Sequence, residues 1–180
     1  GFKLYKLAIS TSGEYVSAAI FEEKLLASFV SKTNKGSTGI LLNQINELFD
    51  KTKASRNDLN ALYLDVGPGY YTGLRIGLSV SQGLGAVLGI PIIPVNGLDA
   101  LAFAAHTSHR KICSLIDIKR NEFAYCEYMP VPGGVTRESD PQVISVENLE
   151  IKLSDDADKK LLVGNCCLLY TSDAADDTTG

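Results

Sequence analysis

The residues best spaced for chemistry are 67–77, which read GPGYYTGLRIG. Gly67 and Gly69 can adopt positive φ or let an anion approach the backbone, and Thr72 is a good N-cap for the helix predicted behind them. A helix N-terminus behind a glycine turn can bind an anion, here through Gly67, Gly69, Thr72 and Gly73. The segment lacks the ending of a Walker loop and the spacing of a dinucleotide fingerprint. A tight strand-to-helix turn that only sets packing is therefore the favoured interpretation.

His106 and His109 form the second arrangement that could hold a ligand, an H-x-x-H spacing at the end of a predicted helix. Such a pair binds a metal weakly, and the sequence shows neither a third ligand at suitable spacing nor an H-E-x-x-H arrangement. Two solvated histidines are favoured, and no metal site, cofactor or catalytic residue is predicted. No serine or cysteine stands in a local context that would make it a nucleophile.

Two charged positions flank predicted strands. Asp65 directly precedes the glycine turn, so we expect it to be half-buried and to bond the free amides of the turn, which is a structural role. The turn at 117–122 carries charges of both signs between two strands. A contact with RNA or with a partner protein is left open there, but a solvated hairpin is favoured.

The four cysteines show neither metal-ligand spacing nor a disulfide framework. They are Cys113, Cys126, Cys166 and Cys167. Two of them are adjacent in sequence, which is poor geometry for a bridge. The sequence therefore predicts reduced thiols and a cytoplasmic protein.

The helix predicted from Thr72 to Leu88 begins at the glycine turn and has Arg75 as its only charged residue. Small residues recur every four positions and form one stripe, namely Gly73, Gly77, Ser81, Gly85 and Gly89. Bulky residues form a second stripe that suits a sheet, namely Ile76, Val80, Leu84 and Val87, with Leu74 and Leu78 beside the small stripe. Each helical glycine costs about 1 kcal/mol relative to alanine, so close packing must compensate. We expect burial on two sides, against its own sheet and against either a second helix of the chain or a partner protein.

The elements around this helix alternate strands with helices. Strands are predicted at 4–10, 15–21, 25–30, 61–66 and 90–95, and helices at 38–50 and 98–105, with a polar linker at 51–60. Ser37 or Thr38 can cap the first helix, and Gly89 ends the long one. The order β-β-β-α-β-α-β-α, opened by an antiparallel meander, implies a mixed sheet covered by helices.

A second lobe follows in similar style. Strands are predicted at 112–116, 122–129, 142–145 and 161–164, with a loop at 130–134 and a short helix at 146–153. We therefore divide the chain into a first lobe at 1–108 and a truncated second lobe at 109–165. Residues 166–180 are acidic and lack apolar periodicity, so we interpret them as a non-native or disordered tail without a part in the fold.

Composition limits the classes of function. The chain has 180 residues, 45% of them hydrophobic and 21% charged, which is ordinary for a soluble globular protein. A net charge of -4 argues against a large intrinsic affinity for nucleic acid, although the protein could act on RNA through a basic partner. No apolar stretch is long enough to span a membrane. The N-terminus has no signal-peptide layout and no initiating Met, which indicates a processed or truncated end.

Residues 67–77, followed by 82–84 (QGL) and 89–91 (GIP), resemble the TsaB (YeaZ) family, whose members carry GPGSFTGLRIG or GPGSFTGVRIG there. Residues 116–125 (IDIKRNEFAY) are similar to IDARRGEVY of the same family. The resemblance covers about residues 4–165 and is strongest from Leu62 to Ala104. The eleven-residue motif is far more specific than a lone glycine pattern.

The resemblance implies an actin/sugar-kinase/Hsp70 ATPase-like α/β fold with two related lobes of mixed sheets, the second incomplete here. It also implies a non-catalytic subunit that pairs with TsaD, which transfers a threonylcarbamoyl group to adenosine 37 of tRNAs. TsaE, an ATPase, joins the complex, and the subunit that this chain resembles contacts tRNA only indirectly. Pairing through the helices of the first lobe implies an interface of Leu41, Ile45, Leu48, Leu74, Leu78, Ser81 and Gly85.

The sequence departs from the family pattern at three places. Ser10 stands where members have Asp, 37–39 (STG) where they have His-Ser-Glu, and Tyr70 and Tyr71 where they have Ser and Phe. A hydroxyl cannot replace a carboxylate on Mg²⁺, so no nucleotide cofactor is predicted. The alternative functions are a metal-dependent glycoprotease-like peptidase and a kinase-like ATPase. A homodimer through the same helix face stays open.

Overall fold

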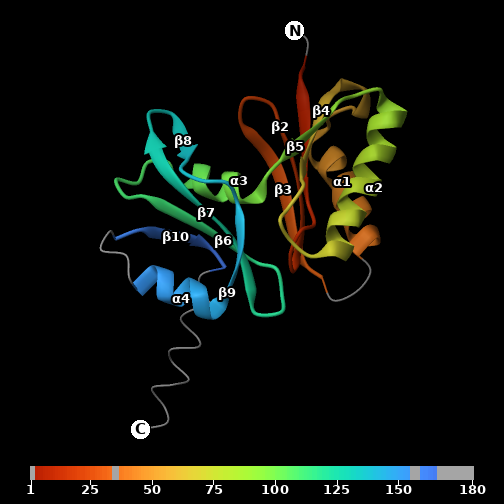
Figure 1. Cartoon of the computed structure of the whole chain (residues 1–180). Coiled ribbons are helices and arrows are strands. Elements are labelled where there is room, and N and C mark those ends of the chain that lie inside the picture. The colour runs from red at the N-terminus through yellow and green to blue at the C-terminus, as the bar shows by residue number, and fades with distance from the viewer. Residues whose placement is uncertain (1–2, 34–36, 155–158, 166–180) are drawn as a thin grey trace. The chain divides into compact units, whose positions relative to one another are not determined.

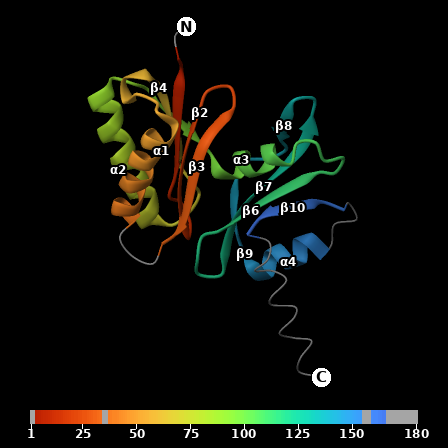
Figure 2. The same cartoon turned by 180° about the vertical axis from the view of Figure 1, so that it is seen from behind.

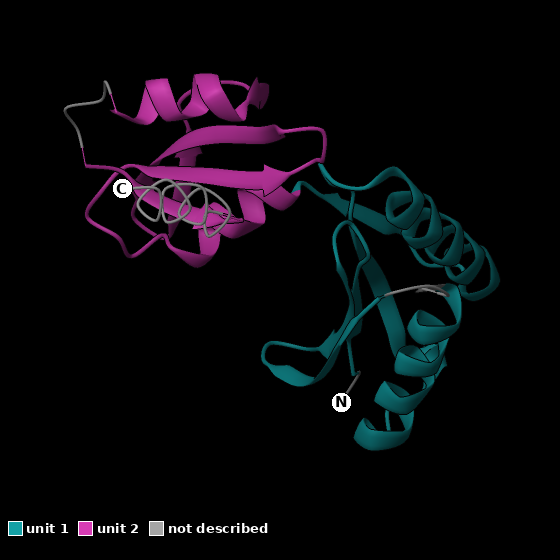
Figure 3. Cartoon of the chain, turned by 90° about the horizontal axis from the view of Figure 1, so that it is seen from below, with its two compact units in different colours: residues 1–96 teal, residues 97–180 magenta. Residues whose placement is uncertain are grey.

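The computed structural model describes residues 3–33, 37–154 and 159–165. The chain divides into two compact units, residues 1–96 and 97–180 (Figure 3). The tail predicted at 166–180, with Cys166 and Cys167, lies outside the described residues.

A five-stranded mixed sheet forms the first unit, in the order β3-β2-β1-β4-β5. Its strands are β1 (Tyr5–Ser10), β2 (Tyr15–Phe21), β3 (Leu25–Lys32), β4 (Leu59–Asp65) and β5 (Ile92–Val95). The first three pair antiparallel, so the predicted meander is confirmed. β4 lies parallel to β1, and β5 lies parallel to β4. Alternate residues of β1, among them Leu7 and Ile9, are buried, as the twofold period of a strand requires.

Two helices, α1 (Ser37–Thr52) and α2 (Tyr71–Leu88), cover one face of this sheet (Figures 1 and 2). The polar linker predicted at 51–60 is shorter than expected, because α1 runs to Thr52 and a turn of 3-10 helix (Arg56–Asp58) leads into β4. Thr38 lies inside α1 rather than at its cap, and the residue that precedes the helix is outside the described residues. Gly89 ends α2 in the left-handed conformation, as predicted.

The second unit is a sheet between two helices. Its strands are β6 (Ile112–Asp117), β7 (Glu122–Val131), β8 (Gly134–Arg137), β9 (Gln142–Ser145) and β10 (Leu161–Gly164). The order is β10-β6-β7-β8, and β9 pairs with β7. On one face α3 (Gly97–Ala104) buries Leu98 and Ala102, and on the other α4 (Val146–Ser154) buries Leu149 (Figure 1).

The predicted loop at 130–134 is wrong. β7 continues to Val131, turns at Gly133 in positive φ, and pairs with β8, which the sequence analysis missed. β8 has four residues, and the glycine and proline around it favour a loop when the sequence is considered alone. The boundary between the two units also falls earlier than the predicted division after residue 108. α3 groups with the second unit because its apolar side chains pack with those of β6 and β7.

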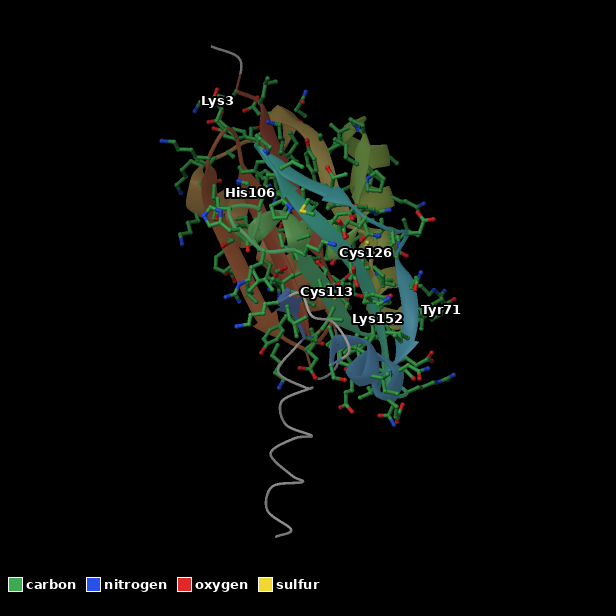
Figure 4. All side chains as sticks on the ribbon, turned by 60° about the vertical axis from the view of Figure 1, so that its left-hand side comes forward. Lys3, Tyr71, His106, Cys113, Cys126 and Lys152 are labelled. Atoms are coloured by element: carbon green, nitrogen blue, oxygen red, sulfur yellow. The ribbon has the colours of Figure 1, made fainter. Side chains whose placement is uncertain are left out.

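Cys113 and Cys126 lie buried on the neighbouring strands β6 and β7 (Figure 4). Burial raises the pKa of the Cys113 thiol to about 12, and it also raises the pKa of Cys126. Both are free thiols, as the sequence analysis expected. Because the thiolate is the reactive form, the raised pKa values lower the reactivity of both thiols. None of the described helices has the length and apolar character that crossing a membrane requires.

A charged clamp joins α3 to β8. Arg137 donates two hydrogen bonds to the Asp99 carboxylate, at 2.8 and 2.7 Å, and the Tyr128 hydroxyl donates a third. Burial raises the pKa of Asp99, but the hydrogen bonds from Arg137 and Tyr128 outweigh burial, and the pKa is lowered below 3.8. The ionised carboxylate therefore stabilises the folded second unit.

We expect Asp99→Asn to lower the free energy of unfolding at neutral pH, by an amount that shrinks in acid. A carboxyl group with a lowered folded pKa stabilises above its unfolded pKa, and the stabilisation is lost as the pH falls through the folded pKa. The difference between wild type and variant should therefore close below about pH 4. Urea unfolding across a pH series measures this difference. A difference that persists unchanged in acid would contradict the stabilising role of the ionised Asp99 carboxylate.

Candidate functional site

The glycine turn of the first unit packs against the β1–β2 hairpin. After β4 the chain passes through Gly67, which has φ +88, and the Tyr70 amide donates to the Ser12 carbonyl oxygen at 2.7 Å. Helix α2 then begins at Tyr71. The predicted N-cap at Thr72 is wrong, because Tyr70 occupies the cap position and makes no side-chain cap hydrogen bond. Backbone contacts with the hairpin replace the cap.

Asp65 is the centre of this contact. Its carboxylate accepts hydrogen bonds from the Ser10 hydroxyl at 2.7 Å, the Ser12 hydroxyl at 2.5 Å and the Gly67 amide at 2.8 Å. The predicted structural role of Asp65 at the turn is confirmed. The Ser10 hydroxyl therefore donates to an acceptor within its own chain.

The same contact fills the space in front of the glycines. The Thr11 hydroxyl donates to the Gly73 carbonyl oxygen at 2.6 Å. A Cβ built on Gly73 would overlap the Thr11 carbonyl oxygen, and one on Gly69 would overlap that of Ser12. Carbonyl oxygens repel an anion, so the geometry favours packing over the anion contact that was the other interpretation of this turn.

We expect Asp65→Ala to lower the free energy of unfolding by about 1–3 kcal/mol, because it leaves the amide of buried Gly67 without its acceptor. Ser10→Ala removes only one hydroxyl donor and should cost about 1 kcal/mol. Denaturant unfolding monitored by circular dichroism measures both values. Equal, negligible losses would show that Asp65 does not organise the turn.

The small-residue stripe of α2 faces its own sheet. Gly77, Ser81 and Gly85 are buried, and a Cβ on Gly77 would crowd the Thr11 hydroxyl. The bulky stripe, which was predicted to suit a sheet, packs beside this contact against the buried core of the first unit, with the exception of Val87. Ile76, Val80 and Leu84 are half-buried, and Val87 is 84% exposed. A Cβ on Gly85 would come within 3.4 Å of the Ile90 carbonyl oxygen and the Ile92 side chain, so small residues fit where α2 lies close to its own sheet.

Burial changes the predicted interface. Five of its seven residues are buried inside the first unit, namely Leu41, Ile45, Leu48, Ser81 and Gly85. Leu74 is half-buried, and Leu78 is 44% exposed. The five buried residues are core residues that cannot contact a partner in this fold, so the interface drawn through them is corrected. Their helical period was recognised, but that period alone does not tell a core face from an interface face.

We call the exposed residues of α2 its outer face. They are Tyr71, Thr72, Arg75, Leu78, Ser79, Gln82, Gly83, Ala86 and Val87. Arg75 is the only charged residue of α2. Beside it a groove of about 280 Å³ is lined by Thr38 of α1 and by Thr72, Arg75, Ile76, Ser79 and Val80 of α2. Arg75 was recognised from the sequence as the single charged residue of this helix, but its position on the outer face was not predicted.

The described residues give metal chemistry no support. In 3–33, 37–154 and 159–165 there is no place where three His, Cys, Asp or Glu side chains come together as ligands. His106 stacks on the Phe103 ring instead, at 4.9 Å between centroids.

Comparisons with known proteins match this α/β architecture, with its mixed sheets, to solved structures described as YeaZ. The solved structure described as YeaZ from Pseudomonas aeruginosa aligns with a TM-score of 0.71 and 27% identity, over 79% of this chain and 67% of that one. The fold class predicted from the sequence is confirmed.

The family model described as "TsaD: tRNA N6-adenosine threonylcarbamoyltransferase" matches residues 29–162. The tRNA threonylcarbamoyladenosine biosynthesis protein TsaB of Buchnera aphidicola subsp. Schizaphis graminum is 30% identical over 162 residues, 88% of this chain and 77% of that protein. TsaB of Escherichia coli K12 is 26% identical over 140 residues, 77% of this chain but 61% of that protein. The chain therefore belongs to the TsaB (YeaZ) family, as its motif indicated, and it spans 77% and 61% of the lengths of these two relatives.

Proposed function

We propose that this chain is a non-catalytic subunit of the complex that makes N6-threonylcarbamoyladenosine in tRNA. Family membership supports this role, because relatives are named for the biosynthesis of that nucleoside. The partner in this proposal is a TsaD-like protein, bound through the outer face of α2. A TsaE-like ATPase joins the pair, and contact with the tRNA is made mainly through the partner.

One observation carries the proposal, which is that the outer face exposes large apolar side chains and a glycine that the packing of the chain itself does not use. Leu78 is 44% exposed and Val87 is 84% exposed, and a Cβ on Gly83 would meet nothing within 4 Å. A helical glycine that no contact of its own chain requires costs about 1 kcal/mol relative to alanine. Close approach of a partner helix explains both the exposed apolar residues and this glycine.

Arg75 fixes the chemistry of the partner. Its guanidinium lies over the Tyr71 ring, 5.5 Å from the centroid, and it lines the groove beside α1. A carboxylate of the partner, seated in this groove, would complete a charge-assisted pair. The partner is therefore a helix with small and apolar residues and at least one acidic residue.

The test is co-purification. We expect this chain to capture a TsaD-like protein from the same cell when the two are co-expressed, and to elute with it in size-exclusion chromatography. The pair, but not this chain alone, should support threonylcarbamoyl transfer to tRNA. Elution of the chain by itself would contradict the pairing, and elution as a dimer would favour self-association through the same face.

The competing function is a peptidase or a kinase-like ATPase. Purified chain should hydrolyse neither a glycoprotein substrate nor ATP above the background of an Asp65→Ala, His106→Ala variant. Turnover that this double substitution abolishes would replace the subunit role by an enzymatic one.

A further inference from the structure

Two stacked rings lie at the carboxyl end of α3. The ring centroids of Phe103 and His106 are 4.9 Å apart and their planes meet at 18° (Figure 4 labels His106). His106 Nδ1 lies 2.8 Å from the Phe103 carbonyl oxygen, which fixes the imidazole ring. Phe103 is 53% exposed, whereas Leu98 and Ala102 of the same helix are fully buried. A large aromatic side chain is thus held in one orientation outside the core.

Strand β8 leaves the ring uncovered because its first residue is Gly134. A Cβ at Gly134 would lie 3.7 Å from Phe103 Cε2, an ordinary van der Waals contact, so a larger side chain there would cover part of the ring. Gly134 is not among the glycines with positive φ, so its backbone conformation does not require glycine. A larger side chain at this position would reduce the exposure of Phe103.

The segment beside the rings is basic in an acidic protein. The net charge of the chain is -4, yet no Asp or Glu occurs between Asp99 and Asp117. His109 and Arg110 follow the stacked pair and are exposed. In the described part of the chain, no ion pair includes Arg110.

We propose that Phe103 and His106, with Arg110, bind single-stranded RNA by stacking on an unpaired base and contacting its phosphate. Every nucleobase presents a π-face to an aromatic ring, and proteins that bind single strands combine such rings with cations. The inference rests on the proposed function only for its choice of RNA. It adds a local contact to a chain whose net charge excludes tight binding on its own.

The experiment is fluorescence anisotropy of a labelled single-stranded oligoribonucleotide with the full chain at low salt. We expect Phe103→Ala to raise the dissociation constant roughly tenfold through loss of one stacked base. Gly134→Val should weaken binding too, since it covers the ring without removing charge. Arg110→Gln should weaken binding and reduce its dependence on salt. Phe103→Tyr, which keeps the ring, should bind like wild type.

Matched controls separate this contact from general effects. Tyr15 is as exposed as Phe103, at 53%, and Tyr15→Ala should leave RNA binding unchanged. Lys24→Gln removes a different exposed cation and should do the same. A fully paired duplex of the same sequence should bind less well, because its bases are not free to stack on protein.

Three outcomes would overturn the proposal. They are absence of binding at low salt, equal affinity for duplex and single strand, and a normal dissociation constant in both Phe103→Ala and Gly134→Val. Circular dichroism melting of each variant confirms that it is folded. Capture of the TsaD-like partner, measured on the same variants, should stay normal, so failure of this site is distinguishable from failure of the proposed function.

Discussion

We expect Leu78→Glu to abolish capture of the TsaD-like partner while leaving the fold of the chain unchanged. Leu78 is 44% exposed on the outer face of α2, so the isolated chain accepts a carboxylate there with its hydration intact. In the complex the same carboxylate loses water beside apolar side chains, which costs on the order of several kcal/mol. An interface of ordinary size has only a modest surplus over its costs, so this penalty is sufficient. Pull-down of the partner and circular dichroism melting measure the two effects.

Leu25→Glu is the matched control, because Leu25 is 64% exposed at the start of β3, away from α2. It should leave both capture and melting unchanged. Ser81→Arg gives the opposite pattern to Leu78→Glu. Ser81 is fully buried on the face of α2 that packs on the sheet. An arginine at this position should therefore unfold the first unit even in the absence of a partner. Normal capture by Leu78→Glu would remove the outer face of α2 from the interface.

The sequence predicted most elements of the fold because their patterns are local. β2, β9 and β10 were predicted with their observed bounds, and β6 and α4 to within one residue, from strand alternation or helical period. The role of Asp65 was also predictable, because a carboxylate directly before a glycine turn has free amides within reach. These inferences use contacts between near neighbours in the chain.

The orientation of α2 was not predictable in the same way. The small stripe and the bulky stripe have the same period, so the sequence shows two faces without showing which one meets the sheet. What decides is the β1–β2 hairpin, where Thr11 comes close to Gly73 and Gly77 from more than sixty positions away. The prediction of Thr72 as the N-cap was wrong for a related reason, since the Tyr70 amide donates to the Ser12 carbonyl oxygen of that hairpin. Phe103 was likewise not singled out from the sequence, because its neighbour Gly134 lies far from it in the chain.

The two faces of α2 should respond oppositely to the same substitution. Gly73→Ala places a Cβ on the Thr11 carbonyl oxygen, and neither backbone can move freely because the Thr11 hydroxyl also bonds to Gly73. We expect it to lower the free energy of unfolding by roughly 3 kcal/mol. Gly83→Ala meets nothing in its own chain and should raise the free energy of unfolding by about 1 kcal/mol. Urea denaturation of both variants measures the two signs.

Capture of the TsaD-like partner then tests why Gly83 is a glycine. If a partner helix approaches closely there, Gly83→Ala should weaken capture although it stabilises the isolated chain, and Gly83→Val should weaken it further. Ala86→Ser, one turn away on the same outer face, changes size only slightly and is the control. A stabilised Gly83→Ala variant with undiminished capture would mean that the partner helix does not pass over this position. The interface would then have to be placed nearer to Arg75 and its groove, at the amino end of α2.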